Sequence, residues 1–275
     1  MISGGKATVA RMFVNNASGQ RGLVCQYDVV CFDEVSGVSF DQKDGVNIMK
    51  GYMESGEFSR GKDSIRADGS IVLVGNFDVD VETQQRRSHL FGPLPPEMRD
   101  DTAFMDRIHA FLPGWDVPKL KPEQFTRHFG LVSDFLSECF RRLRGESRVS
   151  VLQDRVRWGG ALSGRDLTAV NKTVSGLLKL LYPSAAMPVG DEELEWAVRL
   201  ALEVRRRVKE QQKRIGAAEF RNTHFSYTLG PEGVEKFVVT PELASQAGSG
   251  DEPLECGQVW GLGAGGQDDH PGLYR

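Results

Sequence analysis

The chain has 275 residues, of which 40% are hydrophobic and 26% are charged, and its formal net charge is −4. These proportions are those of a soluble globular protein with one or two cores, and no stretch approaches the roughly 20 consecutive apolar residues that span a bilayer. We therefore exclude a membrane protein and expect a cytoplasmic one, in which any binding to nucleic acid depends on local basic patches rather than on net charge.

The first residues, Gly4-Gly5-Lys6-Ala7-Thr8, resemble part of a phosphate-binding loop without completing one. The motif needs an earlier glycine at a fixed spacing and a Ser or Thr directly after the lysine, where this chain has Ala7. The segment also lies too close to the acidic strand described next to leave room for the usual intervening helix and strand. We expect a segment that leads into a helix, and a chain that begins inside its domain.

A short apolar strand followed by two acids comes next. Val29-Val30-Cys31-Phe32 is typical of a strand buried on both faces of a parallel sheet, and Asp33 and Glu34 follow it. Catalytic groups collect at the carboxyl ends of such strands. In P-loop enzymes the first acid of such a pair holds Mg²⁺ and the second polarises the attacking water. The pair therefore indicates an ATP site, although a structural strand that ends in an acidic turn has the same pattern.

A helix and a basic hairpin follow. Apolar residues between 44 and 56 have helical spacing, and Gly56 can end that helix. Residues 57–70 carry turn residues in their middle and at their end, which predicts a hairpin. Its basic residues are Arg60, Lys62 and Arg66. These side chains either contact DNA phosphates in a salt-sensitive, sequence-independent way or belong to a solvated loop.

A second apolar strand, residues 71–78, ends in a polar residue. Asn76 lies near its carboxyl end, and it falls beside Asp33 and Glu34 if the two strands are neighbours. Two adjacent strands that present an Asp-Glu pair and an Asn are far more specific than either strand alone.

The rest of the chain is predicted to be mostly helical. Pro93, Pro95 and Pro96 break regular structure after the second strand. Residues 123–144 form an amphipathic helix in this prediction, and its apolar stripe is assigned to the core. The stripe consists of Phe125, Phe129, Val132, Phe135, Leu136, Phe140 and Leu143.

Two further helices, residues 167–181 and 192–215, complete a helical lid. Pro183 ends the first helix and Asp191 caps the second. The second helix carries a basic run, which we interpret as a solvated or ring-interface helix face rather than a DNA-reading one. The run comprises Arg199, Arg205, Arg206, Arg207, Lys209, Lys213 and Arg214.

The C-terminal quarter is predicted to contain a β-hairpin and a linker. Residues 224–229 and 234–240 flank a Gly-Pro-Glu-Gly turn, and residues 245–253 are rich in Gly, Ser and acids. The four cysteines are scattered through the chain, which indicates reduced thiols without a metal site. They are Cys25, Cys31, Cys139 and Cys256.

These motifs together resemble the AAA+ ATPases. Asp33-Glu34 is similar to the Walker B pair, Asn76 to the sensor-1 residue, and the basic hairpin to the pre-sensor-1 insertion of helicase-like members such as the MCM proteins. The segment from Phe104 to Leu112 resembles the one that carries an arginine finger, which makes Arg107 the candidate. Leu162 to Leu167 resembles the sensor-2 motif, with Arg165 as the phosphate-contacting residue. Arginine suits both tasks because its planar, permanently charged fork matches phosphate oxygens.

The closer resemblance is to BrxL, the Lon-related family of the BREX phage-exclusion systems, and it spans nearly the whole chain. The stretches that carry it are residues 2–10, the acidic strand, residues 53–78, 101–115 and 220–223, and residues 265–275. The resemblance implies a bacterial, cytoplasmic AAA+ protein that forms homo-oligomeric rings, uses ATP with Mg²⁺ held by Asp33, binds double-stranded DNA and works with other BREX components. It also implies a Lon-type domain after the ATPase core, but the Ser-Lys pair of that domain cannot be assigned to any residue of this chain.

The expected fold is therefore a partial α/β core of the AAA+ P-loop type over residues 1–115, a helical lid over 116–215, and a β-containing connector over 216–275. Two functions fit these motifs. The chain is either a truncated part of an ATP-hydrolysing motor or a non-enzymatic DNA-binding or assembly subunit. The missing phosphate loop favours the second for the chain as written, whereas the five candidate site residues favour the first for its parent protein.

Overall fold

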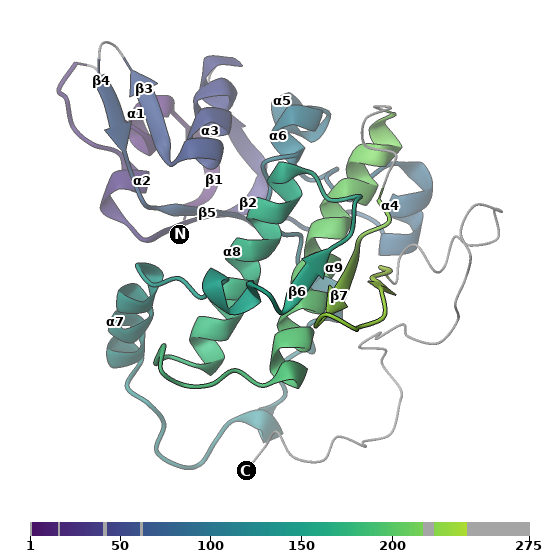
Figure 1. Ribbon diagram of the computed structural model, residues 1–275. Helices are drawn as coiled ribbons and strands as arrows, with labels where there is room; N and C mark the ends of the chain where they lie inside the picture. The colour runs from purple at the N-terminus through teal and green to yellow at the C-terminus, as the bar shows by residue number, and fades with distance from the viewer. Residues whose placement is uncertain (1, 16, 41–42, 61–62, 217–222, 241–275) are drawn as a thin grey trace.

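The computed structural model describes residues 2–15, 17–40, 43–60, 63–216 and 223–240 of the chain (Figure 1). The first part contains β1 Ile2–Ala7, α1 Val9–Met12, α2 Leu23–Gln26, β2 Val29–Phe40, α3 Lys43–Ser55, β3 Glu57–Arg60, β4 Asp63–Arg66 and β5 Ser70–Leu73. The middle contains α4 Val81–Arg87, α5 Pro96–Arg99, α6 Thr102–Met105, η1 Gly114–Asp116, η2 Pro122–Gln124 and α7 Ser133–Arg144. The last part contains η3 Val149–Leu152, β6 Val156–Trp158, α8 Gly164–Leu181, α9 Asp191–Ile215, β7 Ser226–Leu229 and β8 Lys236–Phe237.

A small parallel sheet organises the first part of the chain. Its strand order is β1-β2-β5, and β2 pairs in parallel with both neighbours. The fold is therefore mixed α/β, as expected. The glycine-rich start of the chain is the strand β1, which leads through Thr8 into α1, in agreement with the predicted segment before a helix. An extended strand differs from the tight turn of a phosphate-binding loop.

Burial along β2 alternates instead of being continuous. Val30 and Phe32 are buried, whereas Val29 is 52% exposed. The prediction of a strand buried on both faces is therefore wrong for the described part of the chain. One face of β2 packs on the core that contains Met49 of α3 and Phe104 of α6, while its other face is open beside Val72 of β5.

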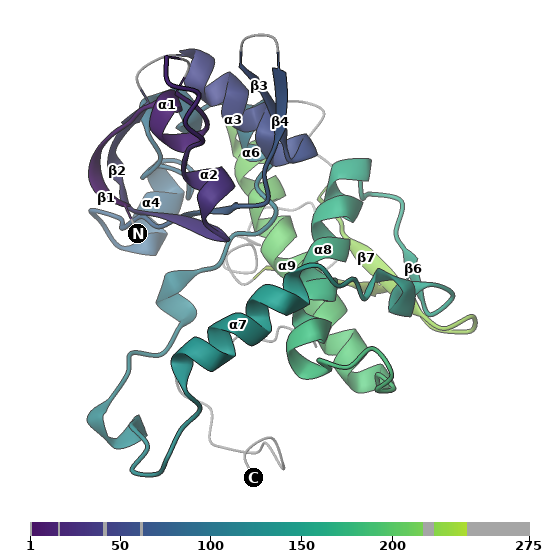
Figure 2. The same ribbon diagram turned by 90° about the vertical axis from the view of Figure 1, so that its left-hand side faces the viewer.

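The helix and hairpin predicted after β2 are both present. α3 ends where Gly56 adopts a left-handed φ of 73°, a conformation that costs glycine little. The strands β3 and β4 then pair antiparallel, with Glu57 opposite Arg66 and Arg60 opposite Asp63. The hairpin stands at one end of the molecule in both ribbon views (Figures 1 and 2).

A second core lies between α8, α9 and a three-stranded antiparallel sheet. That sheet has the order β6-β7-β8, so the predicted C-terminal hairpin is present, with β6 as an additional strand. The two long helices agree with the predicted ranges. Asp191 does not cap α9, because Gly190 is the N-cap residue and the Asp191 carboxylate pairs with Arg155 at 2.6 Å. Among the described helices, none is long and apolar enough to cross a bilayer.

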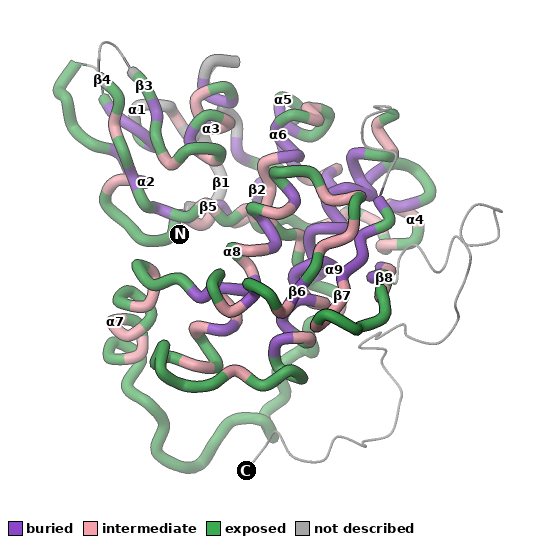
Figure 3. The backbone as a smooth tube through the Cα atoms, in the orientation of Figure 1, coloured by how far each residue is buried: buried purple, intermediate pink, exposed green. Residues whose placement is uncertain are grey.

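The aromatic stripe of residues 123–144 is not in the core, which corrects the sequence prediction. The helix begins only at Ser133, and Phe125 and Phe135 are each 65% exposed, while Phe129 is fully exposed. Figure 2 shows the segment before α7 and the start of α7 standing away from both cores, and Figure 3 shows this region as mainly exposed. Periodicity predicted an apolar face correctly, but the described part of the chain leaves most of that face exposed, and only Leu136 and Leu143 are half-buried.

Four members of the basic run of α9 are buried, which differs from the prediction, whereas Lys213 is exposed as predicted. Arg205, Arg206, Arg207 and Lys209 have exposures between 0% and 6%. The reason is the position of α9, whose C-terminal half passes between the two cores; Val208 packs in the first core and Leu202 in the second. Buried charges need partners of opposite charge. Asp106 and Asp166 pair with Arg205, and Glu210 pairs with Arg206. These four side chains are therefore buried within the chain and do not form the predicted solvated or ring-interface face.

Candidate functional site

Asp33 and Glu34 form a bulge inside β2 and do not follow its last residue. The amide of Val74 donates to the carbonyl of Phe32 at 2.8 Å, and the amide of Val35 donates to the carbonyl of Val74 at 2.9 Å. Two residues of β2 therefore oppose one residue of the neighbouring chain segment. The bulge lies directly after the last registered pair between β2 and β5, Phe32 with Leu73. The acids thus lie where the pairing with β5 ends, although β2 itself continues to Phe40.

Glu34 has an unusual backbone conformation at this bulge. Its φ is 52°, in the left-handed region that residues with a side chain rarely adopt. The amide of Glu34 donates to Oδ1 of Asp33 at 3.1 Å, so the bulge folds the two residues against each other. Asp33 is half-buried and Glu34 is exposed. Strain of this kind collects at functional sites, where the surrounding structure enforces it.

Asn76 lies at the same end of the sheet, two residues beyond Val74. The residue between them, Gly75, packs closely, since a Cβ there would lie 2.8 Å from Cβ of Pro93 and 3.1 Å from Cγ1 of Val35. The predicted strand over 71–78 is shorter in the structure, since β5 ends at Leu73, three residues before Asn76. β5 is nevertheless the neighbour of β2, which is the condition on which the sequence prediction depended. Roles for these side chains in catalysis stay predictions.

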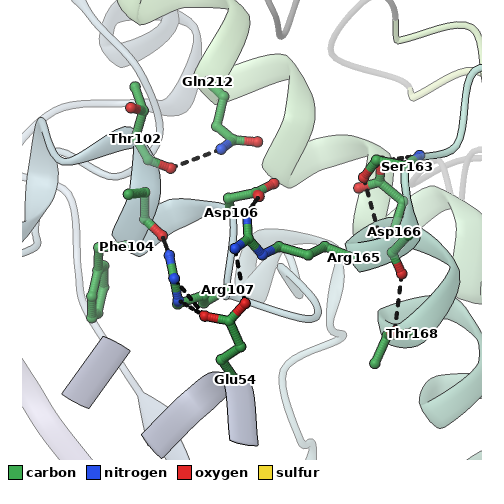
Figure 4. Close-up of polar contacts among 12 residues, drawn as sticks. Glu54, Thr102, Phe104, Asp106, Arg107, Ser163, Arg165, Asp166, Thr168 and Gln212 are labelled. Carbon is green, nitrogen blue, oxygen red and sulfur yellow. Dashed lines mark hydrogen bonds and ion pairs between the residues drawn. The ribbon is translucent and has the colours of Figure 1, made fainter. Parts of the chain in front are cut away.

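Arg107 and Arg165 meet at a single carboxylate, that of Glu54 (Figure 4). Nη2 and Nε of Arg107 donate to Oε2 of Glu54 at 2.5 and 3.2 Å. Nη2 of Arg165 donates to Oε1 of the same carboxylate at 2.8 Å. The structure thus brings the two candidate arginines side by side, although 58 positions separate them in the printed sequence. Glu54 lies in the last turn of α3.

Local structure fixes the position of Arg165. It lies in the first turn of α8, which begins at the N-cap Ser163 with a reciprocal capping box. The amide of Asp166 donates to Oγ of Ser163 at 3.3 Å, and the Ser163 amide donates to Oδ2 of Asp166 at 2.9 Å. The first turn is therefore pinned on both sides, and Arg165 projects from it toward Asp106 and Glu54 (Figure 4).

A buried ion-pair network lies behind the two arginines. Nζ of Lys209 donates to Oδ1 of Asp106 at 2.9 Å, and Nη2 of Arg205 donates to the same oxygen at 3.2 Å. Arg205 also pairs with Asp166, whose side chain is fully buried. The network ties the end of α6 to α8 and α9, and so it connects the two cores where Arg107 and Arg165 emerge.

The charges of this network determine the ionisation of its carboxylates. Hydrogen bonds from Arg165 and Arg107 hold the pKa of Glu54 below its ordinary value. Burial acts to raise the pKa of Asp106, but the hydrogen bond and charge of Lys209 together with the charge of Arg205 outweigh it, and the pKa is lowered. Both carboxylates are therefore anionic near neutral pH.

Sequence reasoning missed Glu54, Asp106 and Asp166. Asp166 had a readable signal, because Ser163 three positions before it completes a capping pattern. Glu54 and Asp106 had none, since their partners lie on elements that only the tertiary fold brings together. Of the DNA-contact candidates, Arg66 is exposed on β4 and Arg60 lies at the end of β3, whereas Lys62 lies outside the described residues.

Comparison with known proteins identifies the family. The family model described as "Lon-like protease BrxL-like, ATPase domain" matches residues 1–226. The chain belongs to the BrxL-like ATPase-domain family. The resemblance inferred from its motifs is thereby confirmed.

Two curated relatives are both called "Lon-like protease BrxL". The protein of Escherichia coli O9:H4 (strain HS) is 49% identical over 279 residues, which cover 100% of this chain and 39% of the relative. The protein of Bacillus cereus (strain H3081.97) is 46% identical over 242 residues, which cover 88% of this chain and 36% of the relative. The chain therefore spans well under half the length of these BrxL relatives.

Proposed function

We propose that the chain is part of an ATP-hydrolysing protein of a BREX-type antiphage defence system, with Asp33 and Glu34 as the acidic pair of its ATP site. The observation that carries this proposal is the bulge in β2, which holds both acids at the end of the β2–β5 pairing with Glu34 in a strained conformation. The name of the ATPase-domain family supports nucleotide chemistry for the parent protein.

The side chains at the sheet have distinct tasks in this proposal. Asp33 helps to hold Mg²⁺, Glu34 polarises the attacking water, and Asn76 orients that water. The residues fit this metal, because Mg²⁺ is commonly held by one or two carboxylates together with phosphate oxygens and water. Among the described residues there is no cluster of three or more His, Cys, Asp or Glu that would instead form a complete protein cage. Bound Mg²⁺ would neutralise charge on the phosphate oxygens.

Arg107 and Arg165 contact phosphate in the same proposal. Arg165 serves as the sensor-2 residue, and Arg107 as the arginine finger that reaches the site of a neighbouring subunit in a ring. Their common contact with Glu54 supports a shared target, so we propose that both serve one nucleotide at the boundary between two copies of the protein. A ring assembly, a cytoplasmic location and other BREX components as partners belong to this proposal.

The β3–β4 hairpin is the proposed contact with double-stranded DNA. It carries Arg60, Lys62 and Arg66, and basic side chains on an exposed hairpin meet phosphates without reading sequence. We expect Arg66→Ala to weaken DNA binding and to reduce its salt dependence, whereas Arg87→Ala, at an exposed position of α4, leaves both unchanged. Equal DNA affinity of the two variants would remove the hairpin from the proposal.

The decisive experiment is Glu34→Gln in the full-length protein. The amide keeps the shape of the side chain but cannot polarise water, so we expect nucleotide binding to persist while ATP turnover falls by about 100-fold or more. The control is Glu82→Gln, which makes the same charge change at an exposed position of α4, where Glu82 pairs only loosely with Arg86 at 3.8 Å. Turnover of Glu34→Gln equal to that of the control would sink the assignment.

The alternative is a non-enzymatic DNA-binding or assembly subunit. In that case the wild-type full-length protein binds DNA but releases no phosphate from ATP, and Glu34→Gln changes neither property. The same two assays, phosphate release and DNA binding, therefore separate the two functions.

A further inference from the structure

The Glu54 carboxylate occupies a position suited to a phosphoryl group. Its two oxygens receive three hydrogen bonds from two guanidinium groups, at 2.5 and 3.2 Å from Arg107 and at 2.8 Å from Arg165. A terminal phosphate offers oxygens of the same charge type, and arginine binds carboxylate and phosphate with the same planar fork. Glu54 and a phosphate therefore compete for the same donors.

Each arginine has a second anchor that does not depend on Glu54. Nη1 of Arg107 donates to the carbonyl of Ala103 at 2.7 Å, and Nη1 of Arg165 donates to Oδ2 of Asp106 at 3.0 Å. Asp106 is in turn held by Lys209 and Arg205. Both guanidinium groups consequently keep their positions when Glu54 leaves, which is what a preorganised anion site requires.

Glu54 is also the most exposed carboxylate of this group. Its side chain is 46% exposed, whereas those of Asp106 and Asp166 are 8% and 0% exposed. A half-exposed ion pair is worth little in water, so its replacement by a doubly charged phosphate is feasible. The contacts described join four cationic side chains (Arg107, Arg165, Arg205, Lys209) to three carboxylates, and the departure of Glu54 leaves two positive charges in excess.

We propose that Glu54 is an internal counter-ion that occupies the phosphate position between Arg107 and Arg165 and is displaced when the terminal phosphate of a nucleotide binds there. This inference rests on the proposed function for the identity of the phosphate, but the anion site itself depends only on the two arginines. Glu54 thereby neutralises part of the charge of the two arginines while no phosphate is bound, and it lowers the affinity of the site for phosphate.

Binding of inorganic tripolyphosphate to the chain, measured by isothermal titration calorimetry, tests the proposal. We expect Glu54→Gln to bind roughly tenfold more tightly than wild type, because the competing charge is gone. Glu82→Gln makes the same charge change away from the arginines and is expected to match wild type. Adding Arg107→Ala to Glu54→Gln should abolish the gain, which excludes binding at the basic hairpin as its source.

A second measurement needs no change at position 54. In the wild-type chain, tripolyphosphate should shift the Nε–H resonances of Arg107 and Arg165 as their contacts pass from Glu54 to the ligand. The proposal is overturned if Glu54→Gln binds no more tightly than Glu82→Gln, if the gain survives loss of Arg107, or if neither resonance moves. If Glu34→Gln loses turnover while Glu54→Gln binds tripolyphosphate no more tightly than wild type, this inference alone is refuted. If Glu34→Gln keeps its turnover while Glu54→Gln binds tripolyphosphate more tightly, the proposed ATPase function alone is refuted.

Discussion

Arg205 and Asp166 form an ion pair in which neither side chain has any exposed surface. Nε of Arg205 donates to Oδ1 of Asp166 at 2.8 Å, and Oδ2 of the same carboxylate accepts from the backbone of Ser163. One aspartate therefore both neutralises a charge on α9 and begins α8. The two long helices of the second core are joined through it at the place from which Arg165 reaches Glu54.

Replacing Asp166 should destabilise the fold strongly. Asp166→Ala leaves Arg205 buried with one carboxylate partner fewer and removes half of the capping box, so we expect the free energy of unfolding to fall by about 3–5 kcal/mol. Urea denaturation of the chain measures this. Asp134→Ala, at an exposed first-turn position of α7, is the matched control and should change stability by less than about 0.5 kcal/mol. A loss below about 1 kcal/mol for Asp166→Ala would contradict the buried pair.

His109 should make stability depend on pH. Burial, together with the charges of Lys172 and Arg205, lowers the pKa of His109 to about 4. The unfolded chain takes up a proton at about pH 6.5 while the native chain does not, so unfolding is favoured as pH falls through this window. We expect the free energy of unfolding to fall by about 2 kcal/mol between about pH 7 and about pH 5 because of this residue. Above about pH 6.5 the imidazole is mainly neutral in both the native and the unfolded chain, so this loss of stability is absent there.

The measurement for His109 is urea denaturation across that pH range. His109→Gln should flatten the pH dependence, because glutamine has no titrating group. His128→Gln, at an exposed position, should retain the wild-type dependence. The burial argument fails if the two variants lose stability in parallel as the pH falls.

Local patterns in the sequence were sufficient to predict much of the fold. The ranges of α3, α8 and α9 follow from helical spacing, and the left-handed Gly56 ends α3 as expected of a glycine. The sequence left open whether the strand before Asn76 neighbours the strand that carries Asp33, and the pairing of β5 with β2 meets that condition.

Tertiary partners could not be predicted in the same way. Arg205 is a basic residue in a basic run, and only the passage of α9 between two cores makes it a buried partner of Asp166. Phe129 belongs to a regular aromatic stripe, yet burial depends on whether another element covers that stripe. Glu54 meets Arg107 and Arg165 only because α3, α6 and α8 converge, which no spacing within one segment reveals.

The close packing at Gly75 yields the sharpest test of the site's geometry. A Cβ at this position would lie 2.8 Å from Cβ of Pro93 and 3.1 Å from Cγ1 of Val35, and the proline ring cannot move aside by rotation. We expect Gly75→Ala to cost about 1–3 kcal/mol and to displace the neighbouring Asn76 and the bulge at Asp33.

Gly51→Ala is a control variant that is expected to raise the stability of the protein, whereas Gly75→Ala lowers it. Gly51 lies inside α3, and a Cβ there would have no neighbour within 4 Å. Gly51→Ala should therefore stabilise the chain by about 0.5–1 kcal/mol, because alanine is the better helix former. Thermal and urea unfolding of both variants measure the two effects, and amide chemical shifts of Asp33, Glu34 and Asn76 report the displacement. If Gly75→Ala left those shifts unchanged and stabilised the protein as Gly51→Ala does, the packing of Gly75 against Pro93 and Val35 would be refuted, and with it the tight contact that supports the acidic bulge.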